Sequence, residues 1–395
     1  MDVVIVGAGI GGLTAALSLL RTGHKVQVLE QASELLEIGA GVQLSPNCTR
    51  VLFELGLGDE LVARASEPVS KEVRLWNTGQ SWKLFDLGPM CREKYGYPYL
   101  TIHRAHLHAT LLDAVNRHSP GAITLNAKVA SCLANGQGAT VTTTDGRSFT
   151  GDVVVGADGV HSAIRAQLFG NDKPGFSGLV AWRGLIPMAK LPAHLRDARG
   201  VNWIGPGSHV IHYPLSSDGL VNFVGAVERS DWKVESWHEK GSVDECLRDF
   251  ANWHADVQTL IKSIATPYKW ALMTREPMAS WTTGCITLLG DACHPTLPFL
   301  AQGAAMAIED GFMLARALNE YPGQPGQALQ KYEAARKDRT SRVVRGSNDN
   351  AKRFHDHSLA NEAGATQYVD REWTPDRVVE RYDWLFSYNV NEAVI

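Results

Sequence analysis

The sequence predicts an α/β fold in which a mixed β-sheet is inserted into a unit built on a parallel sheet, followed by a C-terminal helical segment. Short β-branched runs end in glycine-rich or Gly-Asp turns at three places far apart in the chain. The middle of the sequence alternates short strands and turns, and the end is polar with helical spacing. With 395 residues, 44% of them hydrophobic and 20% charged, the chain is long enough for two ordinary domains with buried cores.

The N-terminal part predicts a strand, a glycine-rich turn, a helix and a second strand. Residues 3–6 are a β-branched run suited to a strand buried on both faces, and residues 13–20 have helical apolar spacing. A second strand at 25–29 ends at Glu30. The G-x-G-x-x-G turn after the first strand completes the pattern of a Rossmann-like dinucleotide-binding unit.

Each part of this turn has a physical task. Gly7 permits the tight turn, Gly9 lets a pyrophosphate approach the backbone, and Gly12 lets the helix pack closely on the sheet. The pyrophosphate then lies at the helix N-terminus, where free N–H groups and the helix dipole favour negative charge. Glu30 is placed to accept hydrogen bonds from ribose hydroxyls. The motif by itself does not distinguish NAD from FAD.

Two later strand ends narrow the choice of dinucleotide. Residues 153–155 form a buried β-branched run that ends in the turn around Asp158, within GADGVHSAIR. Residues 286–289 form another, which ends in the Gly-Asp pair at Asp291, within GDACHPTLPFLAQGAAMAIEDG. Together with the N-terminal turn and Glu30, these stretches resemble the three motifs of the single-component flavin aromatic hydroxylases. That family includes p-hydroxybenzoate, salicylate and 3-hydroxybenzoate hydroxylases and 6-hydroxynicotinate monooxygenase.

The resemblance implies a non-covalently bound FAD and assigns residues to it. In such proteins the acid at Asp291 hydrogen-bonds the ribityl chain, and residues 300–304 offer backbone N–H groups to the pyrimidine edge of the flavin. Gln43 and Arg104 correspond to positions beside the flavin. The full set of expected cofactor-binding residues is Gly7, Gly9, Gly12, Glu30, Gln43, Arg104, Asp158, Asp291, Gly303 and Ala304.

The resemblance also implies hydroxylation of a small phenolic acid of the salicylate or 3-hydroxybenzoate type. NADH or NADPH reduces the flavin, O2 adds to it as a C4a-hydroperoxide, and the electron-rich substrate ring attacks that group.

In the stretch HVIHY, an extended strand places His209 and Tyr213 on one face and His212 on the other. Similar H-x-x-x-Y pairs in the family imply that His209 is the catalytic base towards the substrate hydroxyl, which Tyr213 hydrogen-bonds. Tyr99 and Pro298 are further expected substrate contacts.

Changes in composition divide the chain into parts. Strand and turn patterns indicate the inserted sheet, with the substrate expected between it and the flavin. A polar stretch at 325–360 predicts one long helix, whose basic face from Arg336 to Arg345 is expected to be solvated rather than an interface or a nicotinamide-phosphate surface. The aromatic residues of 382–386 are expected to pack back onto the body. The expected organisation is a discontinuous FAD-binding domain of residues 1–75, 100–177 and 270–345, a substrate-binding sheet layer of 76–99 and 178–269, and a C-terminal helical segment of 346–395.

Charge and cysteine content argue against several classes of function. The net charge of -4 and the lack of a basic block argue against a nucleic-acid partner, and no run approaches the ~18 apolar residues of a membrane span. Six scattered cysteines without zinc-like spacing predict no metal site and a reducing, cytoplasmic setting. A homodimer is compatible with the sequence.

Alternatives stay open on the substrate and on catalysis. 6-Hydroxynicotinate is an alternative substrate, although Phe299 stands where the hydroxynicotinate enzymes of the family tend to carry a histidine. A flavin halogenase is disfavoured because the stretch WRGLIP has one Trp where the halogenase motif has two. A disulfide reductase is disfavoured because no redox cysteine pair and no second G-x-G-x-x-G is found. A non-catalytic FAD-binding redox sensor is the remaining alternative of another class.

Overall fold

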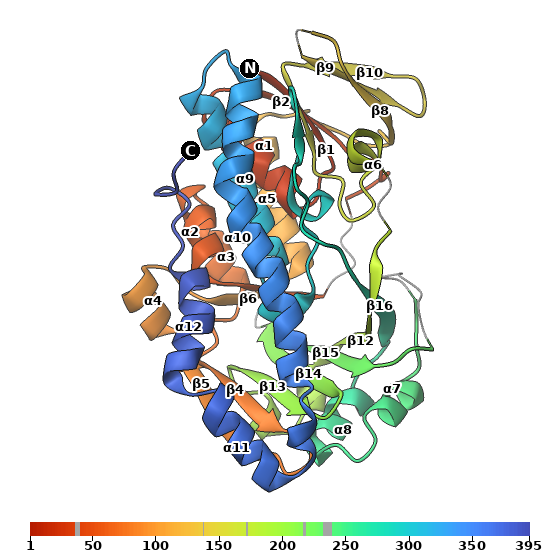
Figure 1. Cartoon of the computed structure of the whole chain (residues 1–395), viewed down its shortest axis with the longest axis vertical. Coiled ribbons are helices and arrows are strands. Elements are labelled where there is room, and N and C mark those ends of the chain that lie inside the picture. Colours follow the sequence, from red (N-terminus) through yellow and green to blue (C-terminus); the bar gives the residue numbers. More distant parts are fainter. Residues whose placement is uncertain (36–39, 137, 171–172, 216–218, 232–238) are drawn as a thin grey trace.

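The computed structural model describes residues 1–35, 40–136, 138–170, 173–215, 219–231 and 239–395. Two units lie one above the other in Figure 1, the upper one built on a mainly parallel sheet and the lower one on a larger mixed sheet. One long helix, α10 (Pro325–Phe354), runs past both units. The α/β fold class is therefore confirmed.

The upper unit contains a six-stranded sheet in the order β17-β18-β11-β1-β2-β7. Its central strands are those that the sequence predicts. β1 (Asp2–Val6) lies parallel between β2 (Lys25–Leu29) and β11 (Val153–Gly156), and β18 (Ile286–Leu288) pairs in parallel with β11. The apolar side chains of these strands are buried, as in a sheet covered on both faces. Their carboxyl ends therefore meet at one edge of the sheet.

Helices and small sheets complete the upper unit. Helix α1 (Ile10–Arg21) packs between α5 (Arg104–His118) and α9 (Gly303–Glu320). A two-stranded antiparallel sheet, β3 (Gly41–Leu44) with β6 (Leu100–His103), belongs to the same unit. The other elements are β7 (Ile123–Thr124), β8 (Val129–Ala134), β9 (Ala139–Thr143), β10 (Ser148–Gly151), β17 (Thr282–Thr283), α2 (Pro46–Glu54), α3 (Gly58–Arg64) and α6 (Ala163–Phe169).

The lower unit is a seven-stranded sheet in the order β16-β12-β15-β14-β13-β4-β5. Its strands are β4 (Ser70–Leu75), β5 (Ser81–Asp86), β12 (Gly175–Pro187), β13 (Arg199–Gly205), β14 (Ser208–Leu215), β15 (Leu220–Glu228) and β16 (Tyr268–Thr274). The sheet is mixed because β4 pairs in parallel with β13, whereas β16 pairs antiparallel with β12. The sheet therefore includes residues 70–75 and 270–274, which the sequence assigns to the FAD-binding domain. These strands belong to the sheet because they hydrogen-bond to strands far away in the sequence.

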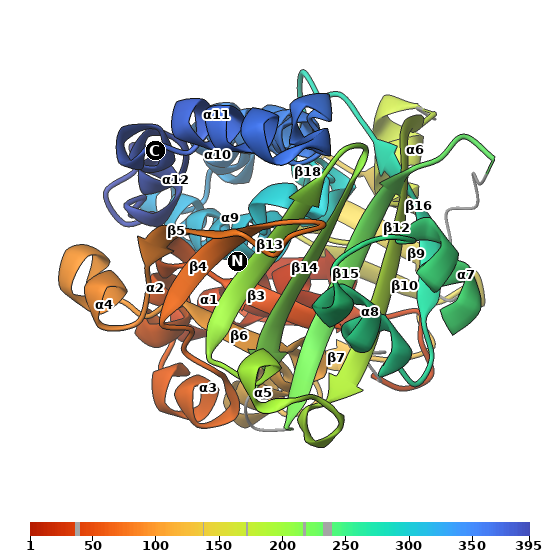
Figure 2. The same ribbon diagram turned by 90° about the horizontal axis from the view of Figure 1, so that it is seen from below.

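The two faces of the lower sheet have different environments. On the outer face, Trp182, Trp203 and Phe250 form a buried cluster beneath α7 (Val243–Asp249) and α8 (Ala255–Lys262), which lie over the sheet in Figure 2. The inner face packs against residues of the upper unit and of α10. A substrate held by the inner face therefore lies between the two units.

The C-terminal segment is helical, with α11 (Glu362–Glu372) and α12 (Pro375–Phe386) following α10. Tyr382 and Phe386 lie 5.3 and 6.0 Å from the ring of Phe85 in β5, measured between ring centroids. Tyr95, in the short helix α4 (Pro89–Tyr95), also meets Phe386 edge to face. The expected return of these aromatic residues onto the body is confirmed.

The basic residues of α10 differ from the expected solvated face. Arg336 is fully buried, with its guanidinium 2.6 Å from Glu309 and 2.7 Å from Asp310 of α9. Arg339 also contacts Glu309, at 2.8 Å. The expectation is therefore wrong for these two arginines, because α9 offers two buried carboxylates. Arg345 is exposed, as expected.

The carboxylates of this cluster keep their charge despite their burial. Burial alone raises the pKa of Asp310, but His294 and Arg336 outweigh it and lower the pKa to about 2. Burial likewise opposes ionisation of Glu309, and Arg339 and Arg336 bring its net pKa below the ordinary value. The two acids of α9 are therefore ionised and neutralised by arginines of α10.

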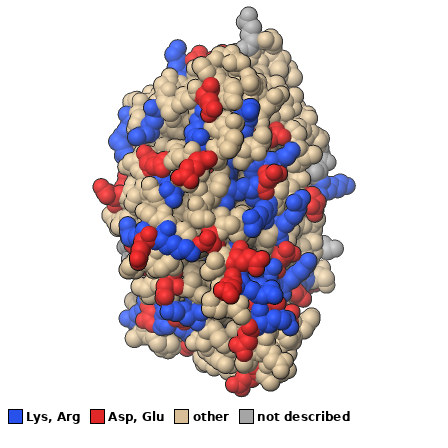
Figure 3. Space-filling view, turned by 60° about the vertical axis from the view of Figure 1, so that its left-hand side comes forward, with Lys and Arg blue, Asp and Glu red and all other residues tan. Residues whose placement is uncertain are grey.

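Charge is mixed over the surface. On the face shown in Figure 3, Lys and Arg are intermingled with Asp and Glu over most of the view. Among the helices of the described residues, none combines the length and the apolar character that crossing a membrane requires.

We expect Arg336→Met to destabilise the protein strongly. The substitution keeps a long side chain but leaves Glu309 and Asp310 without their main counter-charge, and breaking a buried pair typically costs about 3–5 kcal/mol. Urea unfolding followed by circular dichroism measures the loss. Arg345→Met, on the exposed side of the same helix, is the matched control and should stay within about 0.5 kcal/mol of the parent. Equal stability of the two variants would contradict this role of the cluster.

Candidate active site

The candidate site lies where the carboxyl ends of the parallel strands face the lower sheet. Glu30 follows β2, Asp158 follows β11, and Asp291 follows β18. Because β18, β11, β1 and β2 lie side by side and run parallel, the three acids lie along one edge, as is usual for nucleotide sites in such sheets. The structure thus brings together the three motifs that the sequence singles out.

The glycines of the first turn divide into two kinds. Gly7 has a φ of 106°, and an added Cβ would stand 2.4 Å from Ala157 O. At Gly12 an added Cβ would stand 2.0 Å from Gly7 O, so both positions require glycine for packing within the protein. At Gly9, apart from the adjoining residues of the chain, no atom of the described residues lies within 4 Å of an added Cβ. The protein itself therefore leaves room at Gly9, as the approach of a pyrophosphate requires.

Glu30 is held against the same turn. One carboxylate oxygen accepts the N–H of Ala8 at 2.9 Å, and the other accepts the N–H of Ala32 at 2.9 Å. The carboxylate therefore joins the end of β2 to the glycine turn. Its binding to a ribose remains a prediction.

Asp158 and Asp291 both offer carboxylate oxygens to the site. Asp158 Oδ2 accepts the N–H groups of Ala163 and Ile164 at 2.8 and 3.3 Å, whereas its buried Oδ1 has no partner among the described residues. Asp291 is exposed between buried neighbours. The buried surroundings of this carboxylate raise its pKa, while His294 and Arg104 pull the pKa in the opposite direction. Arg104 thus lies close enough to Asp291 to influence it.

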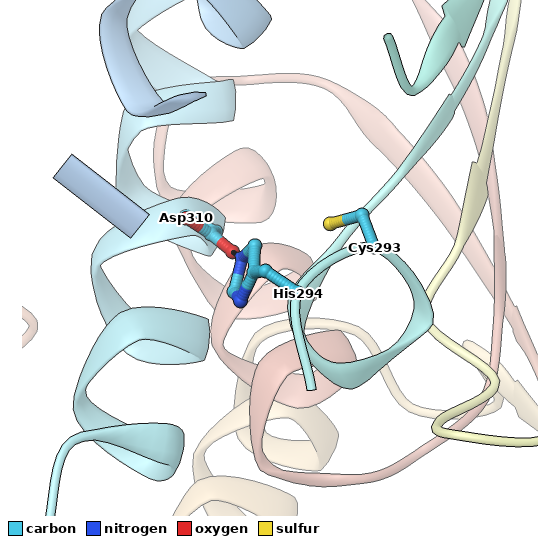
Figure 4. Close-up of side chains that lie close together, drawn as sticks. All are labelled: Cys293, His294 and Asp310. Atoms are coloured by element: carbon cyan, nitrogen blue, oxygen red, sulfur yellow. Dashed lines mark hydrogen bonds and ion pairs between the residues drawn. The ribbon is translucent and has the colours of Figure 1, made fainter. Parts of the chain in front are cut away.

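The Gly-Asp turn is fixed from beneath by Asp310. Its Oδ2 accepts the N–H of Gly290 at 3.1 Å and lies 2.6 Å from Nε2 of His294, while Oδ1 accepts from Arg336. Figure 4 shows His294 directed towards Asp310, with Cys293 beside them. The possible ligand atoms of these three lie within 4.8 Å of one another. Since Arg336 and the two other donors already satisfy the carboxylate, we interpret the cluster as support for the turn rather than as a metal site.

The chain then turns into the N-terminus of α9. Pro298, which is exposed, begins a short 3-10 helix, and Ala301 adopts a left-handed φ of 55°. Gly303 and Ala304, both half-buried, form the first turn of α9, where backbone N–H groups have no partners within the helix. An added Cβ at Gly303 would make only an ordinary contact of 3.6 Å with Thr296. The helix start is therefore uncrowded, as expected of a surface that receives the flavin.

The inner face of the lower sheet carries the expected catalytic pair. Strand pairing places His209, Ile211 and Tyr213 on one face of β14, and His209 contacts Phe299 edge to face at 4.9 Å between centroids. The hydroxyl of Tyr213 donates to Gly41 O at 2.8 Å. His212 points towards the outer face. The predicted orientation of the strand is therefore confirmed, whereas the roles of the two residues remain predictions.

Gln43 accepts hydrogen bonds from two polar side chains near Tyr213. Its Oε1 accepts from the hydroxyl of Tyr99 at 2.7 Å and from Nζ of Lys71 at 3.3 Å. Burial lowers the pKa of Lys71 to about 8 and raises the pKa of Tyr99 and of Tyr213 well above the ordinary value. The two phenols are thus neutral hydrogen-bonding groups, whereas Lys71 keeps its charge at neutral pH.

Three residues of this face escaped the sequence reasoning. Lys71 lies on β4, Asn202 on β13 and Asn222 on β15. Oδ1 of Asn202, Nδ2 of Asn222 and Nε2 of His209 are buried and have no hydrogen-bond partner in the part of the chain that the structure describes. These residues could have been recognised in the sequence as polar residues at positions of a strand whose neighbours two residues away are apolar and face inwards. These atoms are polar groups on an otherwise apolar face, and within the described residues they have no partner.

The comparisons with known proteins agree with this geometry. A family model described as FAD binding domain matches residues 1–347. The chain is 38% identical to a 3-amino-4-hydroxybenzoate 2-monooxygenase of Streptomyces platensis, over 98% of this chain and 96% of that protein. It is 35% identical to a 3-hydroxybenzoate 6-hydroxylase of Klebsiella oxytoca, over 100% of this chain and 98% of that protein. The solved structure of HpxO from Klebsiella pneumoniae, complexed with FAD and uric acid, matches with a TM-score of 0.85 and 27% identity, over 100% of this chain and 97% of that chain.

The chain belongs to the FAD-binding family of group A flavin monooxygenases. FAD is its cofactor, as the sequence predicts. The residues present fit that group, because Gly9 is open, Oδ1 of Asp158 is unsatisfied and Asp291 is exposed at the end of β18.

We expect Asp291→Ala to fold but to retain FAD poorly. The variant leaves a ribityl hydroxyl without its acceptor, a loss of about 1–3 kcal/mol. The ratio of flavin to protein absorbance after gel filtration, and titration of the apoprotein with FAD, measure the effect. Asp113→Ala, on the exposed face of α5, is the control and should bind FAD normally. A full flavin content in Asp291→Ala would show that this carboxylate does not hold the ribityl chain.

Proposed function

We propose that this protein is an NAD(P)H-dependent FAD monooxygenase that hydroxylates the ring of a small phenolic acid of the salicylate or 3-hydroxybenzoate type. The two curated relatives described above carry names of enzymes that act on hydroxybenzoates, which supports an aromatic hydroxy acid as substrate. The observation that carries the proposal is a cationic side chain on the inner face of the lower sheet. It lies beside Tyr99 and Tyr213, on the face that also carries His209.

The cation is Lys71. Among the residues that the structure describes, its hydrogen-bond partner is the amide oxygen of Gln43 and it pairs with no carboxylate. A buried ammonium group normally has an anionic partner, because isolated charges lose their hydration. We propose that the substrate carboxylate is that partner. Its binding would also restore the pKa of Lys71 towards the ordinary value.

The proposed base is His209. Its ring is fully buried, and the unpartnered Nε2 lies on the same face as Tyr213. Desolvation holds the pKa of His209 well below the ordinary value, so the ring is neutral and able to accept a proton. Tyr213 would then hold the oxygen from which the proton departs. Removing that proton makes the substrate ring electron-rich.

Bound FAD supplies electron transfer from the nicotinamide and the activation of O2. The chain contributes the surroundings for this chemistry. Phe299 and Tyr99 would cover the apolar ring of the substrate and exclude water, while Lys71 and Tyr213 would bind its carboxylate and its hydroxyl group. His209 accepts the hydroxyl proton at Nε2.

The alternatives predict different behaviour. 6-Hydroxynicotinate also has a carboxylate and a hydroxyl group, so Lys71 would suit it, but Phe299 occupies the position next to His209. A redox sensor would show no turnover stimulated by an aromatic substrate. Oxidation of NADH and NADPH with salicylate, 3-hydroxybenzoate, 3-amino-4-hydroxybenzoate and 6-hydroxynicotinate, with product and hydrogen peroxide measured together, separates these cases. We further propose a cytoplasmic setting, supported by six thiols that are all free; a homodimer stays a prediction.

We expect His209→Ala to slow hydroxylation by about a hundredfold or more, which is the usual contribution of a general base. Flavin reduction by NADH should stay measurable, so NADH would be consumed with release of hydrogen peroxide instead of hydroxylated product. Product formed per NADH consumed is the measurement. His212→Ala is the control on the other face of the strand and should be much milder. The proposed base is wrong if His209→Ala stays fully coupled.

We expect Lys71→Met to raise the KM for 3-hydroxybenzoate by about tenfold or more, because a charge-assisted hydrogen bond contributes about 1.5–3 kcal/mol. Binding of 3-hydroxybenzyl alcohol, which lacks the carboxylate, should change little. In the parent protein the KM for the acid should rise as the pH passes above about 8, where Lys71 loses its proton, and this rise should be absent in the variant. Lys83→Met, exposed on β5, serves as control. An unchanged preference for the acid in Lys71→Met would remove this lysine from substrate binding.

A further inference from the structure

His209 is the inner member of a line of three side chains. Its Nδ1 lies 2.6 Å from Nε2 of His355, which directly follows α10. Nδ1 of His355 lies 3.2 Å from Oε1 of Glu228, the last residue of β15. The line joins the buried face of β14 to the surface, because His209 is fully buried whereas the Glu228 side chain is 52% exposed.

The hydrogen bonds in this line fix the position of each proton. An ionised Glu228 can only accept, so Nδ1 of His355 carries a hydrogen and its Nε2 is a lone pair. That lone pair accepts from Nδ1 of His209, which must then carry a hydrogen. In the neutral ring, Nε2 of His209 is therefore left as a lone pair, and this is the buried atom that has no partner among the described residues.

The protonated form of His209 is unfavourable in these surroundings. Phe299 and Phe354 pack on the ring of His209, and His355 is the titratable group in contact with it. Burial holds the pKa of His209 well below its usual range, and burial lowers the pKa of His355 to about 4 although Glu228 raises it. An imidazolium at His209 would be an unpaired charge in an apolar environment. A base here works best if the proton moves on.

Solvent reaches the outer end of the line. A surface pocket of about 690 Å³ is lined by both Glu228 and His355, together with Arg229, Asn348 and Lys352. His355 therefore contacts the buried histidine on one side and lines a surface pocket on the other. The backbone holds it there, since His355 O accepts the N–H of Gly207 at 3.1 Å, in the turn that precedes β14.

We propose that His209, His355 and Glu228 form a proton relay that carries the substrate's hydroxyl proton to this surface pocket. The inference rests on the proposed role of His209 as base. As the substrate O–H bond breaks, an N–H bond forms at Nε2 of His209. The hydrogen on Nδ1 of His209 passes to Nε2 of His355, and the hydrogen on Nδ1 of His355 passes to Glu228 or to water in the pocket. One proton leaves the substrate, one reaches the surface, and both histidines end neutral.

The relay explains why a histidine of low pKa can act as a base. After the transfer each histidine carries its hydrogen on the other ring nitrogen. The starting state returns when a proton passes inwards along the same line and Nε2 of His209 gives its hydrogen to the phenolate oxygen of the product. His355 and Glu228 are relay residues that act through His209 and do not touch the substrate. Their loss should therefore impair proton transfer without impairing FAD binding.

The test compares His355→Ala and Glu228→Gln with the parent holoenzyme, using 3-hydroxybenzoate and measuring product per NADH consumed. We expect His355→Ala to lose coupling by about tenfold or more and Glu228→Gln to lose less. Imidazole, which can enter from the surface pocket and has two usable nitrogens, should restore His355→Ala. N-Methylimidazole, which fills the same space but cannot pass a proton through, should not. Lys352→Gln changes an exposed side chain of the same pocket and should behave as the parent.

The outcomes separate the relay from the base. If His209→Ala is uncoupled while His355→Ala stays coupled, the relay is wrong and the base proposal stands. If both stay coupled, the base proposal itself fails. Equal rescue by imidazole and N-methylimidazole would reduce His355 to a packing role and overturn the relay.

A measurement without substrate decides the matter if 3-hydroxybenzoate is not hydroxylated. Nitrogen-15 chemical shifts of the histidine rings in the holoenzyme report which nitrogen carries the hydrogen. We expect His209 to be protonated at Nδ1 and bare at Nε2, and this preference to weaken in Glu228→Gln. A hydrogen on Nε2 of His209 in the parent protein contradicts the relay.

Discussion

The ion cluster between α9 and α10 is the interaction on which the arrangement of the site depends. Arg336 is the centre of this cluster, and it neutralises Glu309 and Asp310, which are consecutive on α9. Asp310 in turn holds Gly290 and His294 of the Gly-Asp turn. A buried pair of this kind adds little net stability compared with apolar packing, but it demands one geometry, because a displaced partner leaves a charge unpaired.

The same cluster connects the Gly-Asp turn with elements on both sides of it. Oε1 of Glu309 accepts from the amide of Asn47 in α2 at 2.6 Å, and Asn47 also donates to Gln302 at the start of α9. On the other side, α10 continues from Arg336 to Phe354 without interruption and ends beside His209. One helix therefore connects the support of the Gly-Asp turn with His209 on the inner face of the lower sheet. This continuity places two sites that belong to different sheets at a fixed separation.

The sequence predicted the parts of the site that depend on local spacing. The positions of Glu30, Asp158 and Asp291 follow from short strands that end in recognisable turns, and the shared face of His209 and Tyr213 follows from the two-residue period of a strand. The burial of Arg336 could not be predicted in this way, because its partners lie 26 and 27 residues upstream on another helix. Lys71 and Asn202 were missed for a related reason. Only the parallel pairing of β4 with β13 brings them to one face.

The order of the strands in the parallel sheet has a consequence for synthesis. β11 stands between β1, from the first residues of the chain, and β18, which begins at Ile286. The edge of the sheet that carries Glu30, Asp158 and Asp291 is therefore complete only when both β1 and β18 have been made. At 5–20 residues per second, a ribosome needs about 15 seconds or more to reach β18. The edge of β11, which ends at Gly156, stays open until β18 is made about 130 residues later. An unpaired strand edge is open to wrong pairing, so the edge of β11 is the part of the nascent chain that needs protection until β18 is complete.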